Sequence, residues 1–528
     1  MNKTILKKIL SSMSLEEKIG QMFQIGFNGT KITPDLKEMI EDYHVGGIIY
    51  FRRNIESLKQ VSALSNDLQM LSTNKKHNLP LIISTDQEGG AVNRLIGGTH
   101  FPGNMLIGAT RQPGLAEKAG RAIAGELKAV GINMDLAPVL DVSNNPLNIS
   151  VGTRSFGGDP VLVADLGAAF IKGMQGEGII ACAKHFPGHG DTIVDSHLDL
   201  PVIECNRERL EKVEIYPFKA AVEAGVDSIM TAHIYLPALE SGKGIPATLS
   251  YSILTGLLRG KLGYEGIIIT DCLEMKAIAD KFGTVEGSVM AIEAGADIVL
   301  ISHSLDKQKA AIDATIKAVK EGRITEERID QSVLRILGLK RKRIGLENPP
   351  VSDYRKIDKE SEEKIAYEIS KAGVTLVKDE DNLIPINNNY KKVLIIDFSI
   401  KKLSPAEDGM EDNDLLFKYL RKEGVKVEHL ALSGSDRELS IPEEIDLITV
   451  CANSAVYNDN QVKVIKKLQA TGLPLIVISS NPYDLRILPG INTFLAIYDY
   501  SPFNLKVAGE IMIGKYEAKG SLPVILKI

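Results

Sequence analysis

Histidines and aspartates crowd into one stretch of the chain, Ala181–Pro201, which reads ACAKHFPGHGDTIVDSHLDLP. Its ionisable residues of most interest are His185, His189, Asp191, Asp195 and His197. Proline lacks a donor N–H and glycine loses backbone entropy on folding, so Pro187 and the nearby glycines predict a loop rather than a helix. Loops on rigid scaffolds often carry catalytic groups, although a turn-rich connection with local hydrogen bonds is the simpler interpretation.

Asp195 and His197 are two positions apart, which suits acid/base chemistry. In extended or turn backbone this spacing puts both side chains on one side, so the carboxylate can orient and charge the imidazole. Histidine, with an unperturbed pKa of about 6.5, both gives and takes a proton near neutral pH. The pair is therefore a candidate general acid/base.

The same stretch offers nitrogen and oxygen ligands for zinc or a metal pair. However, Pro187 and Gly188 lie between His185 and His189, so the two imidazoles cannot share a helical face as they do in zinc proteases. We expect neither a metal nor another cofactor.

Two further motifs carry arginine beside glycines. TDQEGGAVNR (Thr85–Arg94) holds Asp86 and Arg94, and VGTRSFGGDP (Val151–Pro160) holds Arg154. Glycines let the backbone approach a ligand, and arginine offers a fixed fork of donors for carboxylate or vicinal hydroxyl acceptors. Each motif alone is a weak signal, because surface arginines are common.

A third motif places a carboxylate at the end of an apolar run. In GIIITDCLEMKAI (Gly266–Ile278), Asp271 follows the run and Met275 comes shortly after it. A carboxylate held rigidly at a strand end is suited to act as a nucleophile.

Eight short apolar runs rich in Ile and Val alternate with amphipathic helical stretches. The runs are Met22–Gly26, Val45–Phe51, Leu81–Thr85, Ile132–Leu136, Gly178–Ala183, Val226–Thr231, Gly266–Thr270 and Ala296–Ile301. Apolar strands separated by helices indicate parallel strands with both faces buried. Eight such units predict an α/β fold with a (β/α)8 TIM-like barrel, for which about 250 residues is typical.

Ionisable residues follow five of these runs. They are Asp86 and Glu88, then Lys184 and His185, then His233, Asp271 and His303. Barrel enzymes place their active sites at the carboxyl ends of the strands, so we expect these side chains to meet at one face.

A second α/β pattern follows the barrel. Paired prolines and mixed charge make Gly345–Glu360 a linker. Beyond it, we predict strands at Val374–Lys378, Lys392–Phe398, Ile445–Val450, Leu473–Ser480 and Thr493–Tyr498, and helices at Ser361–Gly373, Asp459–Gly472 and Phe503–Gly514. The predicted division is a catalytic barrel (1–344), a linker (345–360) and a smaller three-layer αβα domain (361–528).

Composition excludes several classes of partner. The 528 residues include 62 Lys plus Arg against 68 Asp plus Glu, a net charge of −6, which gives no general attraction to nucleic acid or anionic membranes. Four cysteines lie far apart without a CxxC pair, so we expect reduced thiols. We find no convincing signal peptide and no apolar run of membrane-spanning length, and we expect a cytoplasmic protein.

The motifs together resemble a known family. DQEGGAVNR, GTRSFGGDP, KHFPGHGDTIVDSHLDLP, MTAHI and TLSYSILTGLLRGKLGYEGIIITDCLEMKAI are similar to glycoside hydrolase family 3, and within it to the bacterial β-N-acetylglucosaminidases. The resemblance covers about Leu15–Leu339 and is weaker beyond. KHFPGHGDT with the following DSH is its most specific part, because β-glucosidases of the family lack that Asp-x-His.

The resemblance implies a role for each matching position. Asp271 would be the nucleophile, His197 the acid/base and Asp195 its partner. The residues that would bind or line the site of the N-acetylglucosamine ring are Asp86, Arg94, Arg154, Lys184, His185 and Met275. Cys272 stands where a small residue such as alanine is expected, a minor departure. A barrel histidine makes an acid from the second domain unnecessary, which fits the few polar motifs after Ser361.

The implied activity is a retaining exo-β-N-acetylglucosaminidase that removes terminal β-linked N-acetylglucosamine, with peptidoglycan fragments (muropeptides) or related disaccharides as small-molecule substrates. A phosphorylase of the same family is the nearest alternative, and a non-catalytic sugar-binding protein is an alternative from another class. The sequence does not identify the natural leaving group or the oligomeric state.

Overall fold

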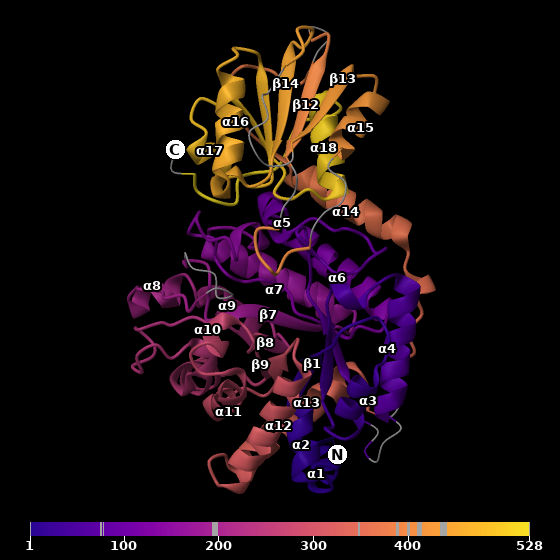
Figure 1. The fold of residues 1–528 in the computed structure, drawn as a ribbon, viewed down its shortest axis with the longest axis vertical. Helices are drawn as coiled ribbons and strands as arrows, with labels where there is room; N and C mark the ends of the chain where they lie inside the picture. Colours follow the sequence, from indigo (N-terminus) through magenta and orange to yellow (C-terminus); the bar gives the residue numbers. More distant parts are fainter. Residues whose placement is uncertain are drawn as a thin grey trace.

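The computed structural model describes residues 2–73, 77, 79–192, 199–346, 349–386, 390–398, 402–408, 414–432 and 441–526. Eight parallel strands form a nearly closed barrel in the lower part of Figure 1. They are β1 (Phe23–Gly26), β2 (Gly47–Tyr50), β3 (Ile82–Thr85), β6 (Met134–Asp135), β7 (Ile180–Phe186), β8 (Ser228–Thr231), β9 (Ile267–Thr270) and β10 (Val299–Ile301). β10 pairs with β1, and a single bridge between Ile269 and Ile298 joins the other edge.

Each predicted apolar run coincides with one barrel strand, so the predicted barrel is confirmed. One boundary was wrong. The predicted strand Gly178–Ala183 ended where we expected a loop, but β7 continues through Lys184 and His185 to Phe186. After an irregularity in the register, Phe186 pairs with Thr231 of β8, which extends the strand into the polar motif.

The barrel helices lie outside the strands. They are α1 (Asn2–Ser11), α2 (Leu15–Gln21), α3 (Pro34–Glu41), α4 (Leu58–Thr73), α5 (Asn104–Thr110), α6 (Pro113–Ala129), α7 (Pro160–Gly176), α8 (Arg207–Lys212), α9 (Tyr216–Glu223), a π-helical segment at Ser252–Lys261, α10 (Lys276–Ala279), α11 (Thr284–Ala294), α12 (Leu305–Lys320) and α13 (Glu326–Arg343). No helix within the described ranges combines the length and apolar character needed to span a bilayer. An antiparallel pair, β4 (Gln87–Gly89) and β5 (Val92–Asn93), follows β3 and was not predicted.

The second domain is a six-stranded sheet with helices on both faces, as the three-layer prediction required. Its strands are β11 (Thr375–Asp379), β12 (Val393–Phe398), β13 (Val427–Leu432), β14 (Leu447–Ala452), β15 (Leu475–Ser479) and β16 (Thr493–Ala496), in the order β11-β16-β15-β14-β12-β13. β11 runs antiparallel to β16. The helices are α14 (Lys359–Gly373), α15 (Leu415–Lys422), α16 (Asp459–Gln469), α17 (Asp484–Ile487) and α18 (Pro502–Met512).

Loops at the carboxyl ends of these parallel strands contact the barrel. Tyr457, after β14, donates to Pro146 O at 3.0 Å. Tyr483, after β15, donates to Ser143 O at 2.8 Å, and Asp499, after β16, accepts from the Gly103 N–H. Because the barrel's own carboxyl-end loops carry the predicted site, the second domain covers the face where that site lies (Figure 1). The exact domain boundaries stay a prediction.

Candidate active site

A cavity of about 480 Å³ opens at the carboxyl ends of the barrel strands, and we call it the barrel-mouth cavity. Seven of the predicted site residues line it: Asp86, Arg94, Arg154, Lys184, His185, Asp271 and Met275. They come from sequence positions between β3 and α10, so the fold brings distant motifs to one wall. Asp195 and His197 lie outside the described residues. The catalytic and binding roles of all nine stay predictions.

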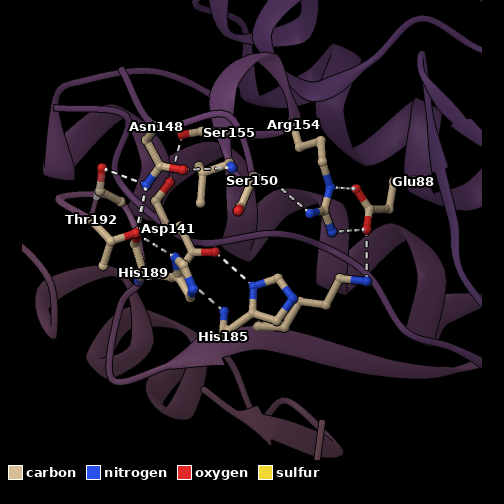
Figure 2. A network of polar contacts seen from close by, with 12 residues as sticks. Glu88, Asp141, Asn148, Ser150, Arg154, Ser155, His185, His189 and Thr192 are labelled. Atoms are coloured by element: carbon tan, nitrogen blue, oxygen red, sulfur yellow. Dashed lines mark hydrogen bonds and ion pairs between the residues drawn. The ribbon is translucent and has the colours of Figure 1, made fainter. Parts of the chain in front are cut away.

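Glu88 connects two of the predicted cations. Arg154 donates to both of its oxygens, Nε to Oε2 at 2.8 Å and Nη2 to Oε1 at 2.6 Å (Figure 2). Lys184 Nζ lies 2.7 Å from the same Oε1. Lys184 also donates to Asp86 Oδ1 at 2.7 Å. A bidentate arginine and a lysine thereby hold one carboxylate, which fixes all three side chains in the wall of the cavity.

Charge pairing keeps these groups ionised. Burial alone would raise the pKa of Glu88, but Arg154 and Lys184 outweigh it and hold that pKa well below its ordinary value. Burial would likewise lower the pKa of Lys184, yet the Asp86 and Glu88 carboxylates raise it above its ordinary value. Both stay charged at neutral pH, so they present fixed charges and donors to a ligand.

Asp141 holds the first two histidines of the polar stretch. His185 Nδ1 lies 2.8 Å from Asp141 Oδ2, and the backbone N–H of His189 donates to Oδ1 at 2.7 Å (Figure 2). Burial would raise the pKa of Asp141, but the His185 and His189 charges lower it. The ionised carboxylate orients the His185 ring, and His185 lines the cavity. Thr192 Oγ1 lies 2.9 Å from His189 Nδ1, which holds the His189 ring as well.

Asp271 directly follows the buried strand β9, as the motif predicted. The backbone N–H of Cys272 donates to Asp271 Oδ1 at 2.7 Å. Behind it, buried His233 contacts Cys272 O at 3.0 Å and Thr248 Oγ1 at 2.8 Å. His233 therefore supports the nucleophile candidate's loop, and it does not line the cavity within the described chain.

The second domain reaches the cavity, which the sequence did not show. Pro405 and Ala406 line it, and Arg94 is paired with Asp408 across 2.5 Å. We expected no catalytic residue after Ser361. The structure shows that the second domain nevertheless contributes to the lining of the barrel-mouth cavity.

The histidine stretch gives no metal cluster among its described residues. His185 and His189 are engaged by Asp141 and Thr192, and Asp191 pairs with Arg209 at 3.0 Å. Elsewhere in the described chain, Cys272, Glu274 and His303 bring three ligand-type atoms within 4.8 Å of one another. Glu274 there already accepts the backbone N–H groups of residues 302, 303 and 304, which satisfies most of its lone pairs. All four cysteines are free thiols.

Three residues that matter to the geometry were missed. The sequence placed Glu88 only among the ionisable residues that follow an apolar run. Its position close to Asp86 could have indicated that it belongs to the site. Asp141 follows a short strand and one proline, Pro138, and nothing in its spacing links it to His185. Asp408 lies more than 300 positions from Arg94, in a segment without a periodic pattern. Such contacts become visible only when the chain is folded.

Comparison with known proteins decides the family. The glycosyl hydrolase family 3 N-terminal domain matches residues 14–339, more than half of the chain. The chain belongs to glycoside hydrolase family 3. This family 3 protein is 33% identical to beta-hexosaminidase A of Pseudoalteromonas piscicida, over 94% of this chain and 91% of that one. The predicted assignment as a glycoside hydrolase is confirmed.

Solved structures share the whole architecture of this chain. A family 3 β-N-acetylglucosaminidase from Paenibacillus sp. str. FPU-7 is 40% identical with a TM-score of 0.92, covering 97% of this chain and 99% of that chain. The beta-glucoside phosphorylase BglX bound to 2FGlc is 25% identical with a TM-score of 0.87, covering 99% of this chain and 96% of that chain. The same two-part fold therefore occurs in both a β-N-acetylglucosaminidase and a phosphorylase.

Proposed function

We propose that this family 3 glycoside hydrolase is a retaining exo-β-N-acetylglucosaminidase that removes terminal N-acetylglucosamine from peptidoglycan fragments. The observation that carries the proposal is that Asp271 lines the same cavity as Lys184, His185 and Arg154. A strand-end carboxylate beside a cluster of fixed donors is what a covalent glycosidase needs to hold a sugar ring against its nucleophile. The names of the similar hexosaminidase and β-N-acetylglucosaminidase support the sugar.

The proposed reaction has two steps. A carboxylate oxygen of Asp271 bonds to the anomeric carbon while the glycosidic C–O bond breaks, and protonated His197 gives its proton to the leaving oxygen. Water then attacks the anomeric carbon, His197 takes a proton from that water, and the carboxylate of Asp271 is released. Two inversions give overall retention. An imidazole thereby replaces the usual second carboxylate.

The described residues on either side of the segment with Asp195 and His197 support this assignment. Before it, Thr192 is bonded to His189 beside the His185 network. After it, Asp199 pairs with Lys281 at 3.1 Å, just beyond the helix α10 that follows Asp271 and Met275. Both flanks are thus attached to elements that adjoin the barrel-mouth cavity.

Three largely buried cations that line the cavity each pair with a carboxylate: Arg94 with Asp408, Arg154 with Glu88, and Lys184 with Asp86 and Glu88. Paired cations still donate hydrogen bonds to hydroxyl groups, but their charge is already neutralised, which suits a neutral sugar. Arg53 and Lys276 line the same cavity, and Arg53 donates to the backbone oxygens of Phe27 and Ser302. Charge alone therefore does not separate hydrolysis from phosphorolysis, and a direct test with phosphate does.

Phosphorolysis is the second candidate, because the phosphorylase BglX shares the fold. An aryl β-N-acetylglucosaminide incubated with and without phosphate separates the two. Free N-acetylglucosamine in both reactions, at rates that phosphate does not change, supports the hydrolase. Sugar 1-phosphate as the main product in the phosphate reaction would reject it.

The peptidoglycan part of the proposal needs defined substrates. We expect turnover of disaccharides in which N-acetylglucosamine is linked to a muramic acid derivative, with and without a peptide, to exceed turnover of chitobiose under the same conditions. Chromatography of the products after short incubations measures this ratio. A clear preference for chitobiose would replace muropeptides by chitin fragments as the substrate.

A further inference from the structure

A short loop of the second domain, residues 402–408, enters the barrel-mouth cavity. In Figure 1 it descends in orange from the second domain toward the barrel. Pro405 and Ala406 line the cavity, and Asp408 lies two positions after Ala406. The loop is held by the barrel hairpin β4–β5, because the Asp408 N–H donates to Ala91 O at 2.8 Å.

The contact point of this loop is Arg94. Arg94 Nη1 lies 2.5 Å from Asp408 Oδ2, and Nη2 donates to Ala406 O at 2.7 Å. The same Asp408 oxygen accepts the backbone N–H of Asn93 at 2.9 Å. The side chains of Arg94 and Asp408 are 6% and 9% exposed, so the ion pair is shielded from water. A shielded, charge-assisted contact of this kind fixes orientation more firmly than a surface ion pair does.

Arg94 keeps donors beyond these two contacts. Each Nη atom carries two N–H groups, and the second domain takes one from each, Asp408 from Nη1 and Ala406 O from Nη2. Nε is buried without a hydrogen-bond partner among the described residues, so it is not exposed to a ligand. Arg94 lines the cavity, so its remaining Nη hydrogens are the donors that it offers to a ligand oxygen there.

We propose that Asp408 is a positioning residue for substrate binding: together with Ala406 O it holds the Arg94 guanidinium in place, so that the remaining Nη hydrogens donate to a hydroxyl or carbonyl oxygen of the sugar. The second domain is then a working part of the sugar site, although it supplies no catalytic group. The inference rests on the proposed function to the extent that the ligand is a sugar.

The nearby acid Glu407 fits the same picture. Its pKa is raised by burial, while the Arg154 charge acts in the opposite direction. The loop therefore holds a second carboxyl group, near enough to Arg154 to respond to its charge. Glu407 is anchored by its own loop, since the Leu403 N–H donates to its Oε2 at 2.7 Å, so the contact with the barrel depends on Asp408.

Asp408→Asn tests the proposal, because it keeps the shape and removes the charge. We expect KM for an aryl β-N-acetylglucosaminide to rise about 10-fold or more with a smaller change in kcat, since a charge-assisted hydrogen bond that orients a binding group is lost. Glu368→Gln is the matched control. It breaks an exposed ion pair between the barrel and the second domain, Lys118 to Glu368 at 2.8 Å, far from the cavity wall, and should leave KM unchanged.

A double-mutant cycle separates positioning from general stability. If Asp408 acts through Arg94, adding Asp408→Asn to the Arg94→Gln variant should barely change its KM. With Arg94 in place, Asp408→Glu should retain part of the binding that Asp408→Asn loses. The proposal is overturned if the two substitutions raise KM independently, so that their effects multiply. It is also overturned if a folded Asp408→Asn protein has an unchanged KM.

The outcome can be told apart from a failure of the proposed function. If the wild-type enzyme ignores the N-acetylglucosaminide but cleaves an aryl β-glucoside, the proposed substrate is wrong, and the same KM comparison on the glucoside still decides the role of Asp408. Thermal unfolding of each variant checks that a KM change does not come from unfolding.

Discussion

Lys184 and Arg154 meet on a single carboxylate oxygen: Glu88 Oε1 lies 2.7 Å from Lys184 Nζ and 2.6 Å from Arg154 Nη2. Glu88 follows β3, Lys184 belongs to β7, and Arg154 lies in the short 3-10 helix Gly152–Arg154 before α7. One buried acid thus joins three separate parts of the barrel at the predicted sugar site. Its position makes Glu88 the main structural support of the cavity wall.

Glu88→Gln should therefore impair both folding and catalysis. Removing one partner of a buried ion pair leaves uncompensated charge, which costs about 3–5 kcal/mol in the free energy of unfolding. Without the Glu88 carboxylate, the donors of Lys184 and Arg154 should shift from their positions. We expect kcat/KM to fall by about 100-fold, because small misplacements of binding groups greatly reduce the rate. Urea unfolding and steady-state kinetics measure the two effects. Glu117→Gln, which breaks only surface pairs on α6, should show neither, and a Glu88→Gln enzyme with normal kinetics would contradict this account.

Asp141→Asn should reduce activity with little change in cavity shape. The amide can no longer stabilise a charged His185 ring or fix its tautomer, so the ring loses its preferred orientation. We expect kcat/KM to fall by about 10- to 100-fold, measured on an aryl β-N-acetylglucosaminide. Asp165→Asn on the exposed side of α7 serves as the control. Equal activity in the two variants would show that His185 needs no partner.

Asp271→Ala should abolish the covalent route. We expect kcat to drop about 1,000-fold or more, as nucleophile removal does in other covalent enzymes. Added azide should restore turnover and give a glycosyl azide of inverted configuration, because a small anion fits the space of the lost carboxylate. Asp280→Asn, on an exposed position just after α10, should behave like the wild type. An Asp271→Ala enzyme that keeps normal turnover would assign the nucleophile elsewhere.

The junction of the two domains should make stability depend on pH. Burial, reinforced by the neighbouring Glu126 charge, raises the pKa of Glu362 on α14 to about 7 from an ordinary 4.5, and Glu362 Oε2 is buried without a partner within the described ranges. The folded state therefore binds this proton more tightly than the unfolded state. Its contribution to stability is present at low pH and is lost as the pH rises from about 4.5 to about 7.

Urea unfolding across that pH range checks this. Glu362→Gln should remove part of the decline in the free energy of unfolding toward neutral pH. Glu360→Gln, an exposed neighbour on the same helix, should retain the wild-type slope. Identical slopes in all three proteins would show that Glu362 titrates normally.

The barrel was predictable because its strands are buried on both faces. A run such as Gly266–Thr270, bounded by polar residues, can only be a buried strand, and β9 occupies Ile267–Thr270. The edge strand β13 was missed for the opposite reason. Val427–Leu432 is partly exposed along its whole length and carries Glu428 and His429, so it lacks both an apolar run and a clean alternation. Helix α15, next to it, was missed as well.

The site was predictable only as a list of side chains. Asp86, Lys184, His185 and Asp271 each follow an apolar run, and barrel geometry alone predicts that they converge. Their partners were not predictable, since Asp141 contacts His185 across 44 positions and Asp408 contacts Arg94 across more than 300. Pairing at such distances depends on loop conformations that no local pattern specifies.

In the proposed reaction, Asp271 forms a covalent bond to the sugar. A fluorinated N-acetylglucosaminyl donor that forms the glycosyl-enzyme faster than water removes it, followed by proteolysis and mass spectrometry, detects this bond. We expect one sugar per chain, attached to Asp271, and loss of the label in Asp271→Ala. A label on another residue, or no covalent adduct together with a product of inverted configuration, would rule Asp271 out as the nucleophile.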